Sequence, residues 1–228
     1  HDLVFMTPEV FLMSNAEDFY NFARTGAMNF RWTAGVFFRA AAFLLRKPGI
    51  GLSLLRAEKR IGSLLEQSWF SATPYLFGDR AVKYSLRPTL KPTSPIPSKP
   101  ALNYLRERLA EQLSQSEASF DLRIQYQLDP YKQPIEDALV PWREEDSPWH
   151  KIATLKLPKQ TLNLPEDVLF SEHLSMNPWR CLPEHRPLGG VNRMRKRIYQ
   201  EGSRWRHDRN NVPVSEPESP QSAMTGKS

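Results

Sequence analysis

The segment NRMRKRIYQEGSRWRHDRNN, residues 192–211, gathers Arg and Lys side chains around one tyrosine and one glycine. A helix turns by about 100° per residue. This turn would place four positions on one narrow stripe: Arg195, Tyr199, Gly202 and Arg206. Other side chains of the segment fall opposite the stripe or flank it with apolar surface, namely Arg193, Arg197 and Arg204 opposite and Met194 and Ile198 beside it. The pattern predicts a helix with one chemically distinct face and not a uniformly basic run.

The chemistry of this stripe centres on the phenol of Tyr199. A phenol has an unperturbed pKa of about 10, but a guanidinium one helical turn away favours the phenolate, and Arg195 has that spacing. Tyrosinate is one of the few side chains that hold haem iron axially. Gly202 would let a flat macrocycle approach the backbone, and Arg206 could bind a propionate through charge-assisted hydrogen bonds. From spacing alone, the alternative that Tyr199 is a core residue beside two solvent-reaching arginines stays open.

Other catalytic templates do not fit the sequence. The five histidines, at positions 1, 150, 173, 185 and 207, show no HxxxH or HExxH spacing, and one cysteine cannot form a CxxC metal site. The glycines of PLGG do not belong to a GxGxxG or GxxxxGK phosphate-binding loop. Cys181 and His185 lie in a proline-broken loop, so we expect a buried structural thiol there and not a nucleophile with its base.

Composition indicates a globular chain with one core. A chain of 228 residues with 40% hydrophobic content can bury one sizeable core. The formal net charge is +6, but 25 acidic residues are interleaved with the cations, so charge favours a nucleic-acid partner only weakly. A basic nucleic-acid-binding module that uses residues 192–206 is the non-enzyme alternative. The single cysteine, Cys181, rules out an intrachain disulfide framework and fits a reducing compartment, with the cytoplasm favoured.

The apolar segments near the N-terminus are too short to cross a membrane. The opening stretch HDLVFMTPEVFLM has strand-like content and no signal peptide, as expected for the middle of a protein. The most lipophilic window, WTAGVFFRAAAFLL, is interrupted by Arg39 and followed by Arg46 and Lys47. A membrane span needs roughly 20 uninterrupted apolar residues. We therefore expect no integral membrane segment and a buried or amphipathic helix here, with peripheral membrane contact as the alternative.

Local patterns predict an antiparallel α+β domain. Asn15 should cap a helix over NAEDFYNFAR, and YLFGDRAVKYSLRP should form a strand whose two faces are Ala81, Lys83 and Ser85 against Val82, Tyr84 and Leu86. The remaining elements, in chain order, are helices at about 31–46 and 54–68, an extended proline-rich connection at 89–100, a helix at 101–116, a strand at 120–128, a strand at about 150–157 and a short helix near 165–174. Strands on both sides of a long connection, followed by an arginine-rich helix, are typical of this class.

The segment RKRIYQEGSRWR resembles the proximal-helix motif of the monofunctional haem catalases, in which R-x-x-x-Y is followed seven residues after the Tyr by a further Arg. In that family the Tyr ligates iron, the first Arg pairs with the phenolate, and the later Arg binds a haem propionate. The resemblance implies that Tyr199 is the metal ligand and that Arg195 acts with it as a catalytic residue. It also implies that Gly202 and Arg206 help to bind the haem.

The resemblance extends over about residues 1–210 and keeps the same order along the chain. HDLVFMTPEVFLMSNAEDF is similar to the catalase stretch W-D-L-V-G-N-N-T-P-V-F-F, and FGDRAVKYSL to the strand that follows it. FDLRIQYQL and PWREEDSPWHKIATLKLPKQ are similar to later barrel strands and to the loop that ends in L-x-L-N-R-N-P. NPWRCLPEHRPLGGVNRMRKRIY is similar to divergent catalase-related proteins, whose proximal helix follows HRPLG. We therefore expect residues 1–210 to form the C-terminal portion of a catalase-like haem-binding domain with a partial β-barrel, and residues 211–228 to form a disordered tail.

Two positions of the resemblance concern the opposite, distal side of the haem. The distal Asn of catalases aligns with Met6, which has no amide to donate to a peroxide, and the Phe that covers the haem aligns with Val82, a smaller side chain. The essential distal His of catalases belongs to a segment that precedes the one aligned with His1. The resemblance thus implies that Met6 and Val82 lie at the haem and that hydrogen peroxide dismutation is slow.

The implied function is that of a haem-dependent, peroxide-metabolising oxidoreductase. A peroxide O–O bond would be cleaved at Fe(III) haem, with anionic Tyr199 donating electron density to the iron and Arg195 tuning that donation. The alternative enzyme is a haem peroxidase or peroxygenase that oxidises an organic co-substrate and has little catalase activity. The expected partner is therefore a peroxide, with an organic co-substrate in the second case; nucleic acid is not expected, and homo-oligomerisation stays open.

Overall fold

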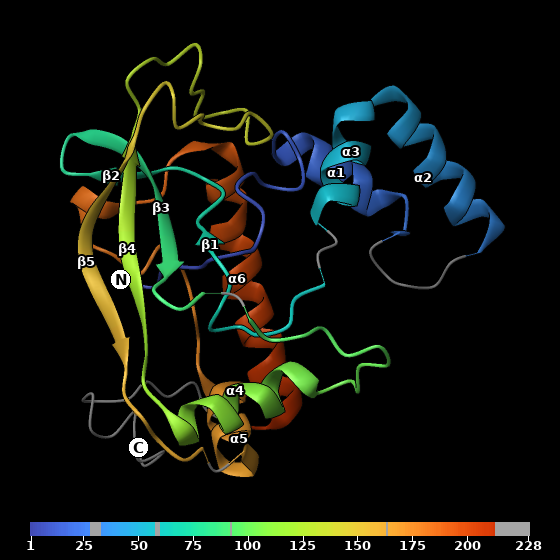
Figure 1. Cartoon of the computed structure of the whole chain (residues 1–228). Helices are drawn as coiled ribbons and strands as arrows, with labels where there is room; N and C mark the ends of the chain where they lie inside the picture. Colours follow the sequence, from blue (N-terminus) through green and yellow to red (C-terminus); the bar gives the residue numbers. More distant parts are fainter. Residues whose placement is uncertain (28–32, 58–59, 92, 163, 213–228) are drawn as a thin grey trace.

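The computed structural model describes residues 1–27, 33–57, 60–91, 93–162 and 164–212. The six α-helices described there are α1 (Ala16–Arg24), α2 (Ala34–Arg46), α3 (Pro48–Ala57), α4 (Tyr104–Gln115), α5 (Leu164–His173) and α6 (Gly189–Asn210). The strands are β1 (Trp69–Phe70), β2 (Tyr75–Phe77), β3 (Arg80–Pro88), β4 (Ala118–Tyr126) and β5 (Trp149–Leu157) (Figure 1). The predicted tail from residue 213 onward lies outside the described residues, so the structure does not test it.

All five strands join one antiparallel sheet in the order β1, β3, β4, β5, and β2 pairs with the same edge of β3 as β1. The β3–β4 ladder runs from Val82 opposite Tyr126 to Pro88 opposite Phe120. The β4–β5 ladder shifts register between Leu122 and Arg123. The sheet is not closed, so the predicted α+β class with a partial antiparallel barrel is confirmed.

The predicted single strand over residues 75–88 is wrong, because these residues form a hairpin. Gly78 adopts a φ of 69° and, with Asp79, turns β2 back onto β3. A positive φ carries no steric cost for glycine, so this residue is suited to the turn. A further strand, β1, is too short for its two residues to show an alternation in the sequence.

The predicted helix at 54–68 is also wrong, since α3 begins at Pro48 and ends at Ala57. Proline suits a first helical turn, where its missing N–H is not needed. Beyond residue 59 the chain approaches the proline-rich connection so closely that a Cβ on Gly62 would lie 2.1 Å from the Ser94 carbonyl oxygen. That approach fixes a non-helical path for residues 60–68, which the helical periodicity of the sequence does not reveal. Of the helix predicted at 31–46, residues 34–46 are helical, and its first two residues fall outside the described part.

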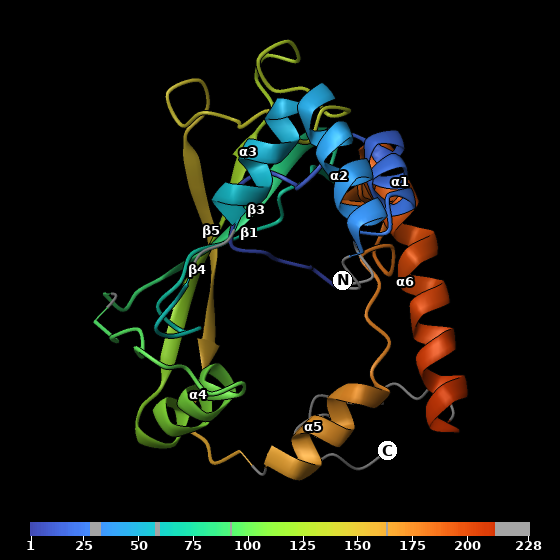
Figure 2. The same ribbon diagram turned by 90° about the vertical axis from the view of Figure 1, so that its right-hand side faces the viewer.

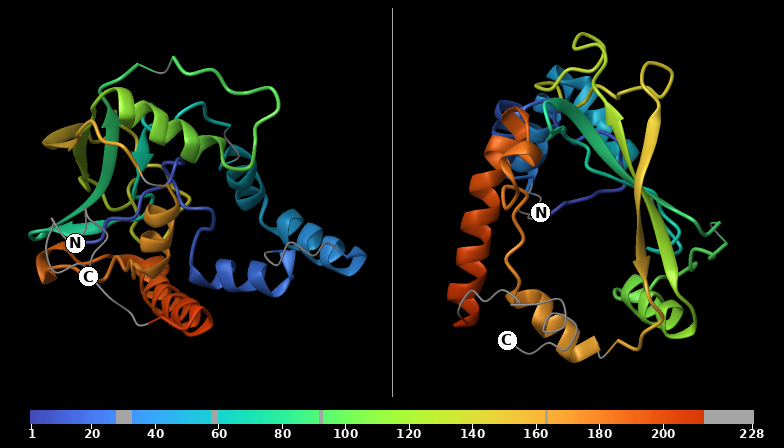
Figure 3. Two further views of the ribbon diagram at one scale, coloured as in Figure 1. Left: turned by 90° about the horizontal axis from the view of Figure 1, so that it is seen from below. Right: turned by 90° about the vertical axis from the view of Figure 1, so that its left-hand side faces the viewer.

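The sheet and α6 lie on opposite sides of the molecule, and the first residues of the chain run between them (Figure 2). The right-hand view of Figure 3 shows the same separation, with α4 and α5 at one end of the molecule. Met6 forms a two-hydrogen-bond bridge with Phe70 of β1, and the Asp2 N–H donates to the Arg180 carbonyl oxygen before α6. Residues 1–6 therefore connect the sheet to the segment that leads into the helix.

Two apolar clusters stabilise the sheet. One packs Leu65 and Leu113 against Ala118 and Phe120 of β4. The other joins the faces of three strands through Tyr75, Val82, Tyr84 and Ile124, and residues Leu3 and Phe5 of the N-terminal segment pack on it. These contacts place the N-terminal segment on the face of the sheet that is turned toward α6.

Burial of both faces of β3 corrects the predicted alternation of that strand. Val82 and Tyr84 are buried as expected, but Lys83 and Ser85 on the other face are 4% and 0% exposed. The Lys83 ammonium lies 5.0 Å from the centre of the buried Trp142 ring. Burial lowers the pKa of Lys83 from 10.5 to about 8, and the nearby Glu9 and Asp137 carboxylates only partly oppose this shift. The loop that carries Trp142 covers this face of β3, although the polar side chains of Lys83 and Ser85 are typical of a face exposed to solvent.

Replacement of Lys83 by Met should stabilise the fold at neutral pH. The unfolded chain binds a proton more tightly than folded Lys83 does, so stability rises as pH increases from about 8 toward 10.5. At pH 7 the buried ammonium costs about 3 kcal/mol by the same shift, and we expect Lys83→Met to recover about 1–3 kcal/mol of it. Urea denaturation at pH 7 and near pH 10 should show this gain shrinking at the higher pH.

The control for this experiment is Lys156→Met on the exposed surface of β5, for which we expect a change within about 0.5 kcal/mol at both pH values. If Lys83→Met destabilises the protein at pH 7, or changes stability equally at both pH values, then burial of the Lys83 ammonium does not lower the stability of the fold as we infer.

Candidate functional site

The position of α6 is set by a short strand-like pairing just before it. The Leu76 N–H donates to the Arg186 carbonyl oxygen, the Gly78 N–H to the Glu184 carbonyl oxygen, and the Leu188 N–H to the Pro74 carbonyl oxygen. Tyr75 and Pro187 form an antiparallel bridge within the same run. These bonds join residues 74–78 to residues 184–188, so the start of α6 is fixed in register with the edge of the sheet.

The two glycines of PLGG begin this helix. Gly189 adopts a φ of 84°, and a Cβ there would lie 2.8 Å from the Ile135 carbonyl oxygen, so both its conformation and its surroundings require glycine. The Glu136 carboxylate accepts a hydrogen bond of 2.8 Å from the Gly190 N–H and pairs with Arg193. A carboxylate at a helix N-terminus is favourable because it binds unpaired N–H groups at the positive end of the helix dipole.

Asn192, in the first turn of α6, is the centre of a buried hydrogen-bond network. Its side-chain amide group donates to the Pro74 and Leu188 carbonyl oxygens at 2.9 and 2.7 Å. Its side-chain oxygen accepts from the Thr73 hydroxyl at 3.0 Å and from Arg195 Nη1 at 3.2 Å. Asn192 has no exposed surface. One side chain therefore ties the approach to β2, the start of α6 and the Arg195 guanidinium together.

Arg195 is held against Tyr199 by this network. Its guanidinium is 8% exposed and donates to the Thr73 hydroxyl at 3.0 Å. Its other terminal nitrogen lies 3.4 Å from the Tyr199 hydroxyl oxygen. The predicted contact between Arg195 and Tyr199 one helical turn apart is thus present, and the cation is oriented by partners on two different elements.

A second tyrosine, Tyr75, lies beside this pair. Its side chain is completely buried, and its hydroxyl makes no hydrogen bond within the described part of the chain. Burial raises the pKa of the Tyr75 phenol, and the nearby Arg195 guanidinium partly opposes the shift. The Tyr75 phenol therefore stays neutral at ordinary pH.

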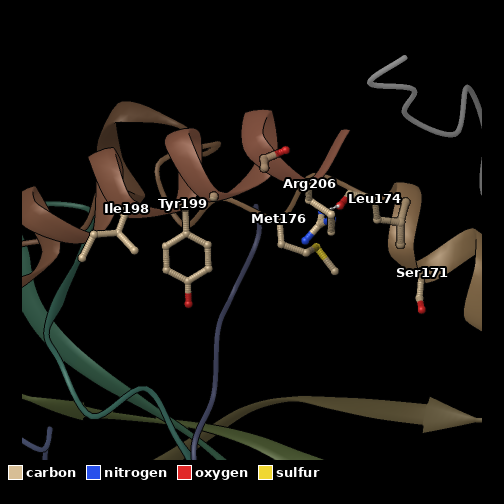
Figure 4. A pocket seen from close by; sticks show the side chains of 8 residues that line it. Ser171, Leu174, Met176, Ile198, Tyr199 and Arg206 are labelled. Carbon is tan, nitrogen blue, oxygen red and sulfur yellow. Dashed lines mark hydrogen bonds between the residues drawn. The ribbon is translucent and has the colours of Figure 1, made fainter. Parts of the chain in front are cut away.

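Tyr199 borders two neighbouring cavities. One has a volume of about 290 Å³ and lies along α6, between Ile198, Gly202 and Arg206 on the helix and Leu174 on the preceding segment. The other has a volume of about 550 Å³ and is lined mainly by residues 1–5. Met176 and Tyr199 line both. Figure 4 shows the Tyr199 phenol projecting from α6 with its hydroxyl pointing away from the helix, and Met176 and Arg206 farther along the same side.

Gly202 and Arg206 face the cavity along α6, as the predicted stripe requires. No described atom lies within 4 Å of a Cβ built on Gly202 apart from its neighbours in the chain and helix, so the backbone surface there is open. One terminal nitrogen of Arg206 donates to the Leu174 carbonyl oxygen, while its Nε is buried and has no hydrogen-bond partner within the described residues. His207 places an imidazole nitrogen 2.8 Å from the His173 carbonyl oxygen. Two adjacent side chains therefore anchor the end of α5 to α6.

Met6 and Val82 are placed differently from the stripe residues. Met6 follows the residues that line the larger cavity but does not line it, and its backbone pairs with Phe70. Val82 is fully buried in the cluster on which Leu3 and Phe5 pack. The structure therefore brings Tyr199, Gly202 and Arg206 together at one cavity with Arg195 behind the phenol, and it leaves Met6 and Val82 behind the cavity wall.

Cys181 is half-buried, where the sequence led us to expect a buried thiol. Its sulfur lies 3.6 Å from the Trp179 carbonyl oxygen, and burial raises the pKa of the thiol. His185 instead stacks on His1 at 6.1 Å between ring centres. A thiol with a raised pKa that bonds to a backbone carbonyl has little thiolate character, so this loop lacks the features of a nucleophilic site.

The cations of α6 are mostly engaged within the protein. Arg195 and Arg206 serve the site, and four more make pairs or ring contacts: Arg193 with Glu136, Lys196 with the Trp179 ring, Arg204 with Glu201 and Arg209 with the Trp205 ring. Arg193, Arg197 and Arg204 are exposed, as predicted from the helical stripe. These cations therefore contact acidic and aromatic side chains of α6 itself and of the segments beside it.

Thr73, Asn192 and His207 are the site residues that the sequence did not indicate. Asn192 carries a weak signal, because it lies three residues before Arg195 and so on the same helical face. Thr73 carries none, since it lies in the segment between β1 and β2 and is 122 residues from Arg195. Its partners depend on the pairing between distant segments.

Comparison with solved structures shows a catalase-like fold. A fungal catalase superposes with a TM-score of 0.72 at 15% identity over 93% of this chain, a bacterial catalase with 0.74 at 15% over 96%, and catalase A from Saccharomyces cerevisiae with 0.69 at 16% over 93%. The chain covers 46–48% of those catalase chains, a little under half of their length. No family model and no curated protein matches the sequence. The superpositions therefore show that the chain has a catalase-like fold.

Removal of the Asn192 side chain should destabilise the protein strongly. Asn192→Ala removes one hydrogen bond from each of two carbonyl oxygens and two donors. Each hydrogen bond contributes about 0.5–1.5 kcal/mol, so we expect a loss of about 2–4 kcal/mol. Chemical denaturation should be compared with Asn210→Ala at the exposed end of the same helix, and equal losses would show that the network does not hold α6 in place.

Proposed function

We propose that this chain is part of a haem-dependent, peroxide-metabolising oxidoreductase of the catalase type, in which Tyr199 ligates the iron. The observation that carries the proposal is the contact of 3.4 Å between Arg195 and a Tyr199 hydroxyl that borders two cavities. The catalase-like fold supports it. In this proposal residues 1–210 form one haem-binding domain, and residues 211–228 do not take part.

The residues around Tyr199 fit a flat, anionic cofactor. An anionic phenolate is one of the few side-chain ligands of haem iron, and buried Arg195 supplies the charge that favours it. The open surface at Gly202 leaves room for a ring against the helix. Arg206 has a buried donor without a partner beside the same cavity, as binding of a carboxylate substituent requires.

Each residue around Tyr199 has a separate role in this proposal. Bound haem supplies the iron at which a peroxide O–O bond is broken. Tyr199 holds the iron and donates electron density to it, while Arg195 limits that donation by stabilising the phenolate charge. Asn192 and Thr73 orient Arg195 through hydrogen bonds. Met176 and residues 1–5 exclude water from the space next to the phenol.

An organic co-substrate is the second candidate within the same chemistry. The larger cavity beside Tyr199 is lined by Leu3, Val4, Phe5 and Met176 as well as by the polar His1 and Asp2. An apolar wall with a few polar groups is typical of pockets for organic molecules. This wall supports a peroxidase or peroxygenase with little catalase activity as the second candidate, because hydrogen peroxide offers no apolar surface to it.

Replacement of Tyr199 by Phe in the full-length protein tests the ligand. Phe keeps the ring and removes only the oxygen, so we expect haem retention to fall by about tenfold or more and the ferric tyrosinate absorption to disappear. The matched control is Tyr131→Phe at a position that is 96% exposed, which should leave both readouts as in the wild type. Unchanged haem content and spectrum in the Tyr199 variant would refute the assignment.

A series at Arg195 tests the role of the guanidinium. Arg195→Leu removes a positive charge beside the ligand, so the bound phenolate becomes more electron-rich and the Fe(III)/Fe(II) reduction potential should fall. Arg195→Lys keeps the positive charge but loses the planar, two-pronged donor geometry of the guanidinium. Its reduction potential should therefore lie between those of the wild type and Arg195→Leu. Potentiometric titration should show no shift for Arg197→Leu on the exposed face of the same helix; one potential for all four proteins would mean that Arg195 does not act on the ligand.

A further inference from the structure

The hairpin of α2 and α3 packs on the protein through one face only. Val36 and Ala40 of α2 form a small cluster with Ala27 and Phe22, and the Phe43 ring lies 5.6 Å from the Phe22 ring. In α3, Ile50 is buried. These inward contacts fix the hairpin on α1. The hairpin itself projects on the side away from β5 (Figures 1 and 3).

The outward face of this hairpin is apolar and exposed. Its large side chains have high exposed fractions: Phe37 57%, Phe38 69%, Leu45 83%, Leu52 46% and Leu55 74%. A shallow groove of about 560 Å³ runs between the two helices from Ala41 to Leu55, and no polar side chain lines it. Contiguous apolar surface of this kind marks an interaction site, whereas single exposed hydrophobic residues do not.

The same hairpin carries cations and no acidic residue. Arg39, Arg46, Lys47 and Arg56 are exposed, and no Asp or Glu occurs between residues 34 and 57. The nearest acidic group of α1, Asp18, is 4% exposed and is already paired with Lys47 at 3.2 Å. The field outside the apolar face is therefore positive, so the face is complementary to a partner that is both apolar and negatively charged.

This charge distribution decides between the possible occupants of the face. In a symmetric contact between two copies, the same surface of each copy meets the other. Arg46 and Arg56 of one copy would then approach cations of the other copy, and this repulsion is unfavourable. A bilayer with anionic headgroups offers acyl chains to the apolar side chains and phosphates to the arginines at the same time. The long arginine side chains can reach the headgroups while their stems stay in apolar surroundings.

We propose that the α2–α3 hairpin docks the protein on the surface of an anionic phospholipid membrane, with Phe37, Phe38, Leu45 and Leu55 entering the interface. Within the described part of the chain no helix is long and apolar enough to cross a bilayer, and α2 and α3 contain 13 and 10 residues. Such helices lie in the plane of the interface, with the apolar face submerged and the cations at headgroup level. The inference does not depend on haem binding.

Vesicle flotation with the full-length protein tests the proposal. We expect the wild type to float with vesicles of equal parts phosphatidylcholine and phosphatidylglycerol, and not with phosphatidylcholine alone. The double variants Phe38→Ser/Leu45→Ser and Arg46→Glu/Arg56→Glu should each weaken binding by about tenfold or more. Controls are Leu102→Ser, at a position that is fully exposed elsewhere, and Arg106→Glu on α4; both should bind as the wild type does.

A labelled variant tests insertion without removing the hairpin. Leu45→Cys carrying an environment-sensitive fluorophore should shift its emission to shorter wavelength on anionic vesicles, and Leu102→Cys should not. The proposal is wrong if the wild type ignores anionic vesicles, if the hairpin variants bind as it does, or if the Leu45 label shows no shift. Light scattering is a further test. If the wild type forms an oligomer and the Phe38→Ser/Leu45→Ser variant dissociates it, this face is a contact between copies and the lipid assignment is wrong.

Discussion

The structure depends on the pairing of two segments that are more than a hundred residues apart. Residues 74–78 and 184–188 exchange backbone hydrogen bonds, and Asn192 extends the pairing into α6 by bonding the carbonyl oxygens of Pro74 and Leu188. The edge of a sheet presents backbone groups without partners, and residues 184–188, which lead into α6, satisfy part of this edge. Together with the Asn192 bonds, this pairing fixes the rotation of α6 about its axis.

That rotation decides what Tyr199 can do. With Asn192 buried against the sheet, Arg195 points into the protein and Tyr199, one turn later, reaches the cavities. A buried guanidinium is stable only when its donors are occupied, and Thr73, Asn192 and Tyr199 accept from it here. The same desolvation strengthens the hydrogen bonds that hold the guanidinium in place. At the other end of the helix, Arg206 and His207 hold the segment after α5 against the smaller cavity.

The cations of this basic protein fall into two groups with different surroundings. Those of α6 bind buried acceptors, carboxylates or aromatic rings of the same chain. Those of the α2–α3 hairpin surround an exposed apolar face that has no acidic residue. Net charge alone, +6 for the chain, does not distinguish these groups, and it led to the weak nucleic-acid alternative. The two groups differ in their surroundings, because cations of α6 lie beside carboxylates and aromatic rings, whereas those of the hairpin border an apolar face.

The sequence by itself determined the features that depend on local geometry. The periodicity of an α-helix places Arg195, Tyr199, Gly202 and Arg206 on one face wherever the helix lies, and the N-cap at Asn15 is equally local. Motif resemblance then identified the catalase-like fold that the superpositions show. Tertiary structure alone decided the rest. Burial of Lys83 under Trp142, the close approach of Gly62 to Ser94, and the packing of Val82 against the N-terminal segment all arise between distant segments. The hydrogen-bond partners of Asn192 also depend on tertiary structure. The chemistry of the amide determines which bonds the side chain can make, but the fold determines which groups lie next to it.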